Sequence, residues 1–219
     1  MKIIGELIYL SINTRPDVSY VVNMLAQYNV SPEAHHYVAA KRVLRYLSGT
    51  IDLQLHYGGD HANGSLRAYT DASWANAVGQ CSISGYVWFY AGSLISHVSK
   101  KQATIALSST EAEYMATTHV IQEGLWLESL FSELRVSLPT PIKIHLDNTG
   151  MIALSTAAKF HNRLKHIDLH YHFIRYHVNK KTFVLQWIPS HKNVADVLMK
   201  PLPRPSFSRF LLALGLMAC

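Results

Sequence analysis

The spacing of hydrophobic residues divides the chain into a first part of helical pattern and a second part in which alternating and helical segments follow one another. Up to about residue 57 the apolar residues recur at helical spacing. Residues 58–64, GGDHANG, have the composition of a linker. The next segment, LRAYTD, alternates, so that Asp71 shares one side of a predicted strand with Arg67 and Tyr69.

Four more segments of the second part have the pattern of strands: GYVWFY, SLISHVS, PIKIHLD and TFVLQWIP. The first two are joined through Ala91 and Gly92, which predicts a hairpin. Helical spacing runs from about Ser109 to Leu134, and shorter helical segments follow the fourth strand and the last.

The predicted elements form a recognisable order. That order, β-β-β-α-β-α-(α)-β-α, is typical of an α/β fold with a mixed five-stranded sheet flanked by helices. The chain is therefore predicted to contain a helical segment, a linker, an α/β domain and a helical tail, at residues 1–57, 58–64, 65–200 and 201–219.

The composition fits a folded protein with a polyanionic partner. Hydrophobic residues make up 49% and charged residues 16% of the chain, which argues against disorder. The formal net charge of +6 favours nucleic acid, although many basic proteins bind no polyanion. Cys81 and Cys219 form no CxxC unit and no apolar segment is long enough to span a bilayer, so we expect a non-secreted, non-membrane protein.

Acidic residues of the second part fall at the ends of different predicted elements. Asp71 and Asp147 close the first and fourth strands. Asp196 starts the last helix, and Glu111 or Glu113 lies in the first turns of the long one. Each acid taken alone is better explained as a turn or helix-cap residue. In an open α/β sheet, however, these positions converge, and functional sites assemble there.

A cluster of acids needs a physical reason. Two carboxylates about 4 Å apart repel by about 4 kcal/mol at an effective dielectric constant of about 20. Such a cluster has to be protonated or to hold cations. Hard oxygen ligands without cysteine favour Mg²⁺ or Mn²⁺, and two such ions promote attack of water on a phosphodiester.

Several long motifs in a fixed order resemble one family. YTDAS, STEAEYMA, HLDNTGMIAL and NVADVLMKPLPRP are similar to the ribonuclease H domain of copia-type long-terminal-repeat retrotransposon Pol polyproteins. GELIYLSINTRPDVSYVVNMLAQ and VAAKRVLRYLSGT resemble the end of that family's reverse transcriptase, its thumb or connection part. The resemblance covers essentially the whole chain and implies a ribonuclease H-like fold.

The resemblance also implies an activity and a site. Ribonucleases H cut the RNA strand of RNA–DNA hybrids with an Asp-Glu-Asp-Asp set and two Mg²⁺ ions, or with Mn²⁺. The three aspartates match Asp71, Asp147 and Asp196. Many relatives carry a histidine before the last aspartate that assists product release or proton transfer, and His191 is the candidate here. The implied setting is intracellular, in a cytoplasmic virus-like particle or the nucleus, with the polymerase domain of the same polyprotein as a partner.

Two glutamates compete for the remaining catalytic position. A helix turns about 100° per residue, so Glu111 and Glu113 do not face the same site. Ser108 and Glu111 have the spacing of a capping box, in which Glu111 reaches back to the N–H of Ser108. Glu113 matches the family's Glu-apolar-x-Ala pattern, so we predict that Glu113 binds metal and Glu111 caps the helix.

Basic residues near the end of the second part are predicted to contact phosphates. They are Arg163, Lys165, Arg175, Lys180 and Lys181. His166 and His170 have the i,i+4 spacing of a zinc pair, but no second pair is evident, so zinc is disfavoured.

Two departures from the family leave a second function open. Residues 79–82, GQCS, stand where the family usually has a basic pair, and the chain contains no Tyr-x-Asp-Asp polymerase motif. The alternative is a catalytically inactive nucleic-acid-binding fragment of a decayed or domesticated copia-type element. A transposase or integrase is disfavoured because its acid set typically closes on glutamate, whereas Asp196 closes this one.

Overall fold

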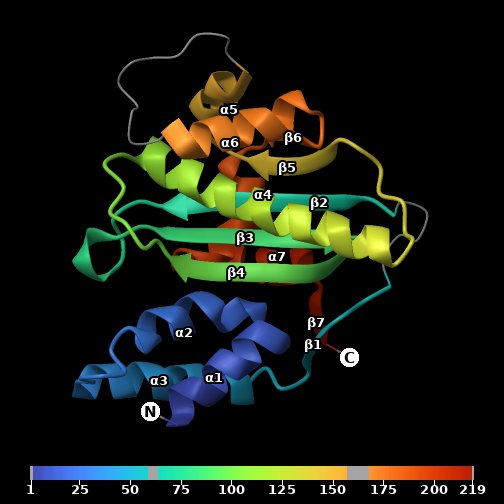
Figure 1. Cartoon of the computed structure of the whole chain (residues 1–219). Helices are drawn as coiled ribbons and strands as arrows, with labels where there is room; N and C mark the ends of the chain where they lie inside the picture. Colours follow the sequence, from blue (N-terminus) through green and yellow to red (C-terminus); the bar gives the residue numbers. More distant parts are fainter. Residues whose placement is uncertain (1, 59–63, 157–167, 219) are drawn as a thin grey trace.

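The computed structural model of the protein describes residues 2–58, 64–156 and 168–218. Its centre is a mixed sheet with the strand order β4-β3-β2-β5-β6 (Figure 1). β2, β3 and β4 are antiparallel neighbours, whereas β5 and β6 run parallel to β2. The predicted fold class, a ribonuclease H-like α/β fold with a mixed five-stranded sheet, is confirmed. The strands are β2 (Leu66–Ser73), β3 (Ile83–Tyr90), β4 (Ser93–Lys101), β5 (Ile142–Leu146) and β6 (Phe183–Trp187).

The turn between β3 and β4 forms where the sequence predicted it. Ala91 and Gly92 have φ angles of 48° and 82°. Positive φ at both central residues produces the backbone twist that suits two antiparallel strands. The hairpin sets the register in which Tyr90 pairs with Ser93.

Helices cover the two faces of the sheet unequally. One face packs against α4 (Ser109–Glu133), α5 (Thr149–Thr156) and α6 (Asp168–Asn179), as Figure 1 shows. On the other face, the short 3₁₀ helix η4 (Val194–Leu198) and α7 (Arg204–Ala213) pack on β3 and its neighbours.

The last predicted helix of the α/β domain is shorter than expected and has 3₁₀ geometry. Its start is held by Asn193, whose side-chain oxygen accepts from the N–H of Ala195 while its amide donates to the carbonyl of Thr70 at 3.0 Å. Pro201 lacks the N–H that a longer helix would need. The element is therefore set by its attachment to β2 rather than by helical propensity.

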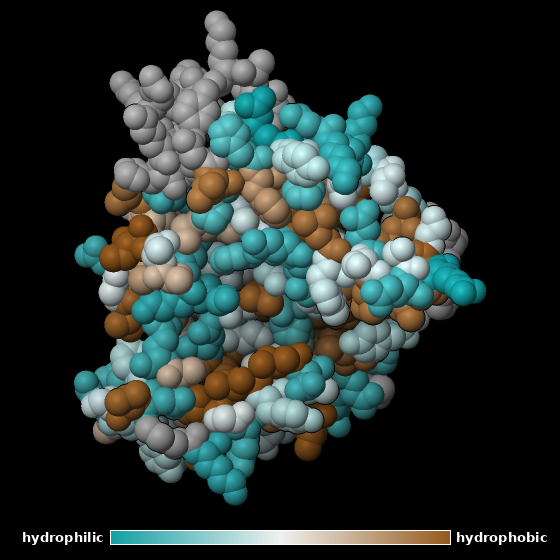
Figure 2. Space-filling view, viewed as in Figure 1, coloured by the Kyte–Doolittle hydropathy of each residue, from teal (hydrophilic) through white to brown (hydrophobic). Residues whose placement is uncertain are grey.

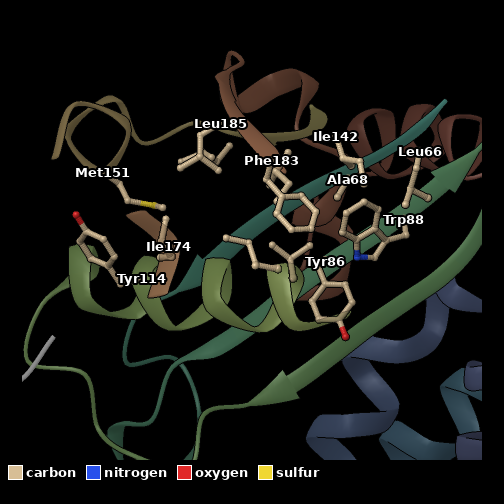
Figure 3. Packing of buried hydrophobic residues seen from close by; sticks show 14 of the residues in the cluster. Leu66, Ala68, Tyr86, Trp88, Tyr114, Ile142, Met151, Ile174, Phe183 and Leu185 are labelled. Carbon is tan, nitrogen blue, oxygen red and sulfur yellow. The ribbon is translucent and has the colours of Figure 1, made fainter. Parts of the chain in front are cut away.

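The main core lies between α4 and the sheet (Figure 3). Leu66 and Ala68 of β2 belong to this core, so the residues that alternate with them, such as Arg67, lie on the opposite face of the sheet. Gly124 allows α4 to approach closely, because a Cβ atom there would lie 2.7 Å from Trp88 and 2.8 Å from Phe183. This contact fixes the position of α4 against the sheet.

The N-terminal helices have a core of their own and pack on the edge of the sheet at β4. Asn23 donates to the carbonyl of Ser99 at 2.5 Å, and a ring nitrogen of His97 lies 2.8 Å from the carbonyl of Ser11. These contacts cover an otherwise open strand edge. The elements are α1 (Lys2–Asn13), the 3₁₀ helix η1 (Pro16–Val18), α2 (Ser19–Ala26) and α3 (Ala34–Ser48). They also expose apolar side chains, seen as brown patches in the lower part of Figure 2.

Two short strands lie in segments where the sequence predicted helix. β1 (Leu53–Leu55) and β7 (Leu216–Ala218) pair antiparallel and join the segment after the N-terminal helices to the C-terminal segment. Three residues are too few to show a period of their own, so this pairing is decided by packing. The division into four parts stays a prediction. Within the described ranges, the structure has no helix long and apolar enough to cross a membrane.

Candidate metal centre

Three of the predicted acids meet at one end of the sheet. Asp71 of β2, Glu113 of α4 and Asp147 after β5 each offer one carboxylate oxygen, and these oxygens all lie within 4.8 Å of one another. Asp71 and Glu113 are buried, and Asp147 is partly buried. Residues from three separate elements thus form one compact group of oxygen ligands.

The topology explains how the two aspartates meet. β2 and β5 are parallel neighbours in which Tyr69 pairs with His145. Asp71 and Asp147 each follow that pair by two residues, so both reach the same edge of the sheet.

Gln102 anchors the start of α4 beside this edge. Its side-chain amide donates to the hydroxyl of Ser84 and to the carbonyl of Ala112, both at 2.9 Å. The hydrogen bond to the carbonyl of Ala112 holds the α4 backbone at the residue that precedes Glu113. Gln102 was not predicted from the sequence, because a single glutamine before a helix has no distinguishing pattern.

The two glutamates of α4 are used differently. The hydroxyl of Ser108 accepts from the N–H of Glu111 at 3.1 Å, as predicted for a helix cap. The carboxylate of Glu111 accepts from the N–H of Leu107 at 2.7 Å, and not from Ser108 as the capping box predicted. The backbone of Ser108 is extended, with φ of −154° and ψ of 162°. The Glu111 carboxylate therefore reaches the N–H of Leu107 and not that of Ser108. Glu113, in contrast, is buried in the acid group.

Burial and mutual repulsion raise the pKa of two members of the group. For Asp71, desolvation is the largest cause, followed by the charge of Glu113 and by hydrogen bonds with neighbouring carboxyls. For Glu113, desolvation again raises the pKa most, and the charge of Asp147 adds to it. Oε2 of Glu113 is buried and has no hydrogen-bond partner among the described residues. A carboxylate in this situation is stable only when protonated or bound to a cation, so the group is able to hold a metal ion.

Asp196, the fourth predicted acid, is not one of the three acids whose oxygens lie within 4.8 Å of one another, but it neighbours Asp71 and is paired with a lysine. It is buried in η4, and its Oδ1 lies 2.7 Å from Nζ of Lys200. The same ammonium is 4.0 Å from Oδ2 of Asp71. Lys200 was not predicted from the sequence as a partner of Asp196, although the i,i+4 spacing of the two residues is a usable signal.

His191 lies in the 3₁₀ helix η3 (Ser190–Lys192) and is exposed. Its backbone carbonyl accepts a hydrogen bond from Arg209 at 2.7 Å. Its part in catalysis stays a prediction.

Of the predicted phosphate-contacting residues that the structure describes, Lys180 and Lys181 lie away from the acids. Lys180 and Lys181 precede β6, at the edge of the sheet opposite to the acids, about five residues of strand or 16 Å away. Arg175 donates to the hydroxyl of Tyr171 at 2.9 Å. Arg163 and Lys165 lie outside the described residues.

The disfavoured zinc pair is only partly described. Nδ1 of His170 lies 3.0 Å from the hydroxyl of Thr118, and His166 is outside the described residues.

Comparison with known proteins finds close relatives among transposon polyproteins. The chain is 42% identical over 214 residues to the retrovirus-related Pol polyprotein from transposon RE2 of Arabidopsis thaliana. It is 37% identical over 205 residues to that from transposon TNT 1-94 of Nicotiana tabacum. These alignments cover 97% and 93% of the chain but only 15% of the length of each relative.

No model of a known protein family matches the chain. Among solved structures, LC11-RNase H1 in complex with an RNA/DNA hybrid superposes with a TM-score of 0.46 at 17% sequence identity. That superposition covers 62% of this chain and 94% of the other.

Proposed function

Because the chain belongs to the retrovirus-related Pol polyproteins of copia-type transposons, we propose that it joins the end of the reverse transcriptase to a ribonuclease H domain. We further propose that it cleaves the RNA strand of RNA–DNA hybrids during reverse transcription. Mg²⁺ is the proposed cofactor, with Mn²⁺ as a substitute. The relatives are much longer than the chain, so the polymerase domain of the same polyprotein is a proposed partner and an intracellular setting part of the proposal.

One observation supports this function above the others. Three carboxylates from three elements lie together at the sheet edge, and one oxygen of buried Glu113 has no hydrogen-bond donor among the described residues. A scaffold gains no stability from such a group. Its retention is explained by a divalent cation that the reaction needs.

The residues proposed to hold the cations are Asp71, Glu113, Asp147 and Asp196. When bound, two Mg²⁺ ions would activate water and neutralise charge that develops on the phosphodiester. Lys200 brings a positive charge to the same place from within the chain. His191, exposed in the loop before Asp196, is proposed to transfer a proton or to assist product release.

Cleavage of a labelled RNA–DNA hybrid in Mg²⁺ tests the proposal. Asp71→Asn and Glu113→Gln each remove a charged ligand, which we expect to cost about 3 kcal/mol of transition-state stabilisation or more, a loss of at least about 100-fold in rate. Glu111→Gln is the matched control, because it makes the same chemical change two residues away at the helix cap. Absence of cutting by the wild-type chain, or undiminished cutting by Asp71→Asn, would contradict the proposal.

A second candidate is a nucleic-acid-binding fragment without catalysis. The ion pair between Lys200 and Asp196 favours it, since a lysine already neutralises part of the acid group. This candidate predicts hybrid binding with a steep salt dependence and no turnover in either Mg²⁺ or Mn²⁺. Measured turnover eliminates it.

A further inference from the structure

β2 and β5 carry the same order of side chains on the same face of the sheet: a basic residue, then an aromatic ring, then an aspartate. The two strands are parallel, and their bases and their rings pair directly in register. The residues are Arg67, Tyr69 and Asp71 on β2, and Lys143, His145 and Asp147 after them on β5. Both rows therefore lead away from the acid group along one surface.

This surface is opposite to α4. Ala68 and Ile144, which alternate with the named residues, are in the main core, so the bases and rings point away from it. On that side η4 and α7 pack chiefly over β3 and part of β2. Neither makes an extensive contact with β5 or β6 within the described ranges. The β5 side of the surface is left open, and Arg67 and Lys143 are exposed.

The surface is positively charged. Arg67 and Lys143 are register partners, and neither forms a salt bridge with an acid within the described part of the chain. The acids in these rows stand at the far end, in the candidate metal centre.

Three rings lie between the basic side chains and the acids: Tyr69 and His145 are half-buried, and Phe89, in the core under η4 and α7, is buried. Tyr69 stacks on His145 with ring centroids 4.8 Å apart and an interplanar angle of 24°. Phe89 of β3 meets Tyr69 edge-on at 5.9 Å, and the guanidinium of Arg67 lies 5.8 Å from the centroid of Phe89. Aromatic rings flanked by basic side chains are the elements that bind single-stranded nucleic acid.

We propose that this face binds a single-stranded stretch of RNA that extends from the hybrid held at the acids. Arg67 and Lys143 contact its phosphates, and the Tyr69–His145 stack contacts a base or sugar. The basic residues Arg67 and Lys143 each lie four residues before the aspartate of the same strand row, about 13 Å away. A single strand covers this distance with a few nucleotides. A single strand fits better than a duplex because a base reaches a ring only when it is unpaired. The identity of the strand rests on the proposed function.

Binding of fluorescent hybrids by the full chain, in EDTA, tests this inference. The probes are a blunt RNA–DNA hybrid and the same hybrid with an RNA overhang at either end. We expect the wild-type chain to bind one overhang hybrid more tightly than the blunt one. Arg67→Ala/Lys143→Ala should abolish that preference and reduce the salt slope for the overhang hybrid by about 1.4, the value for two phosphate contacts on a single strand.

Two further variants separate the contacts from net charge. Lys41→Ala/Arg45→Ala on α3 removes the same two charges from another exposed surface, and we expect it to keep the overhang preference. His145→Ala should reduce the preference about fivefold or more by loss of stacking, without changing the salt slope. Circular dichroism melting checks that each variant is folded.

Two results would overturn the inference: equal binding of blunt and overhang hybrids by the wild-type chain, or equal loss in the α3 control. Neither depends on cleavage, because no divalent ion is present. A chain that prefers the overhang through this face but does not cut in Mg²⁺ keeps the inference and contradicts the proposed activity. A chain that cuts the hybrid in Mg²⁺ but shows no overhang preference keeps the proposed activity and contradicts the inference about this face.

Discussion

The chain buries carboxylates in two regions, and the regions differ in how the negative charge is met. In the N-terminal helices, Asp17 accepts from Nε and Nη2 of Arg15 at 3.0 and 2.8 Å and from the hydroxyl of Tyr46 at 2.6 Å. At the sheet edge, Glu113 retains a buried oxygen without a hydrogen-bond partner among the described residues.

The comparison separates a structural from a functional use of buried charge. Arg15 also donates to the carbonyl and the hydroxyl of Thr50, at 3.1 and 2.8 Å, so the Asp17 network links η1 to the end of α3. Both of its charges are neutralised within the chain. Among the described residues, the acid group at the sheet edge has one nearby ammonium, that of Lys200, for several carboxyls. The group therefore requires protons or added cations. Four experiments test this distinction.

The largest effect is expected from Asp17→Ala. It leaves the buried guanidinium of Arg15 without its partner, which should lower the free energy of unfolding by about 3–5 kcal/mol. Urea denaturation measures the change. Replacing both partners together, with Arg15→Met and Asp17→Leu, should recover much of the loss. A loss below about 1 kcal/mol for Asp17→Ala would show that the network is not structural.

Asp71→Asn should have the opposite sign. In EDTA at pH 8 the folded chain has to take up a proton on Asp71, because burial and the neighbouring acids raise the pKa of this carboxyl to about 11. Asparagine needs no such proton, so we expect the free energy of unfolding to rise by about 1 kcal/mol or more. Mg²⁺ should then raise the melting temperature of the wild-type chain more than that of the variant, because only the intact ligand set binds the ion tightly. Destabilisation by Asp71→Asn, of the size seen for Asp17→Ala, would remove the distinction between the regions.

The acid group should also set a pH dependence. Its raised pKa values mean that the folded chain binds protons more tightly than the unfolded chain. This stability is fully present below the ordinary carboxyl pKa and is lost as pH rises through the raised values. In EDTA, the free energy of unfolding of the wild type should therefore fall relative to Glu113→Gln by about 1–3 kcal/mol between pH 5 and 8.

This pH experiment measures the difference in the free energy of unfolding between the wild type and Glu113→Gln. Burial lowers the pKa of His97 and of other histidines, which acts in the opposite direction and cancels in the comparison. Parallel pH profiles for wild type and Glu113→Gln would mean that Glu113 is already ionised in the folded chain.

Glu111→Gln should have the smallest effect. It weakens one charge-assisted hydrogen bond to the N–H of Leu107, and we expect a loss of about 0.5–1 kcal/mol in thermal or urea unfolding. Cleavage should be retained, because the side chain lies at the helix cap and not in the acid group. Loss of cleavage with unchanged stability would reverse the assignment of the two glutamates.

Much of the α/β part was predictable because its signals are local. The alternation around Asp71, the turn at Ala91 and Gly92, and the cap at Ser108 each depend on a few neighbouring residues, and the structure shows all three. Placing Asp71 and Asp147 at one edge needed only the rule that neighbouring parallel strands end together.

Local patterns in the sequence were therefore enough to predict the order of strands and helices in the α/β part and the acids that stand at their ends. Tertiary structure alone decided what those acids meet: the bond from Gln102 that anchors α4, the ammonium of Lys200 beside Asp196, and the pairing of β1 with β7. The two kinds of feature differ in how far apart along the chain the interacting residues lie. Periodicity and capping act over one or two turns, whereas these contacts join segments that only packing brings together.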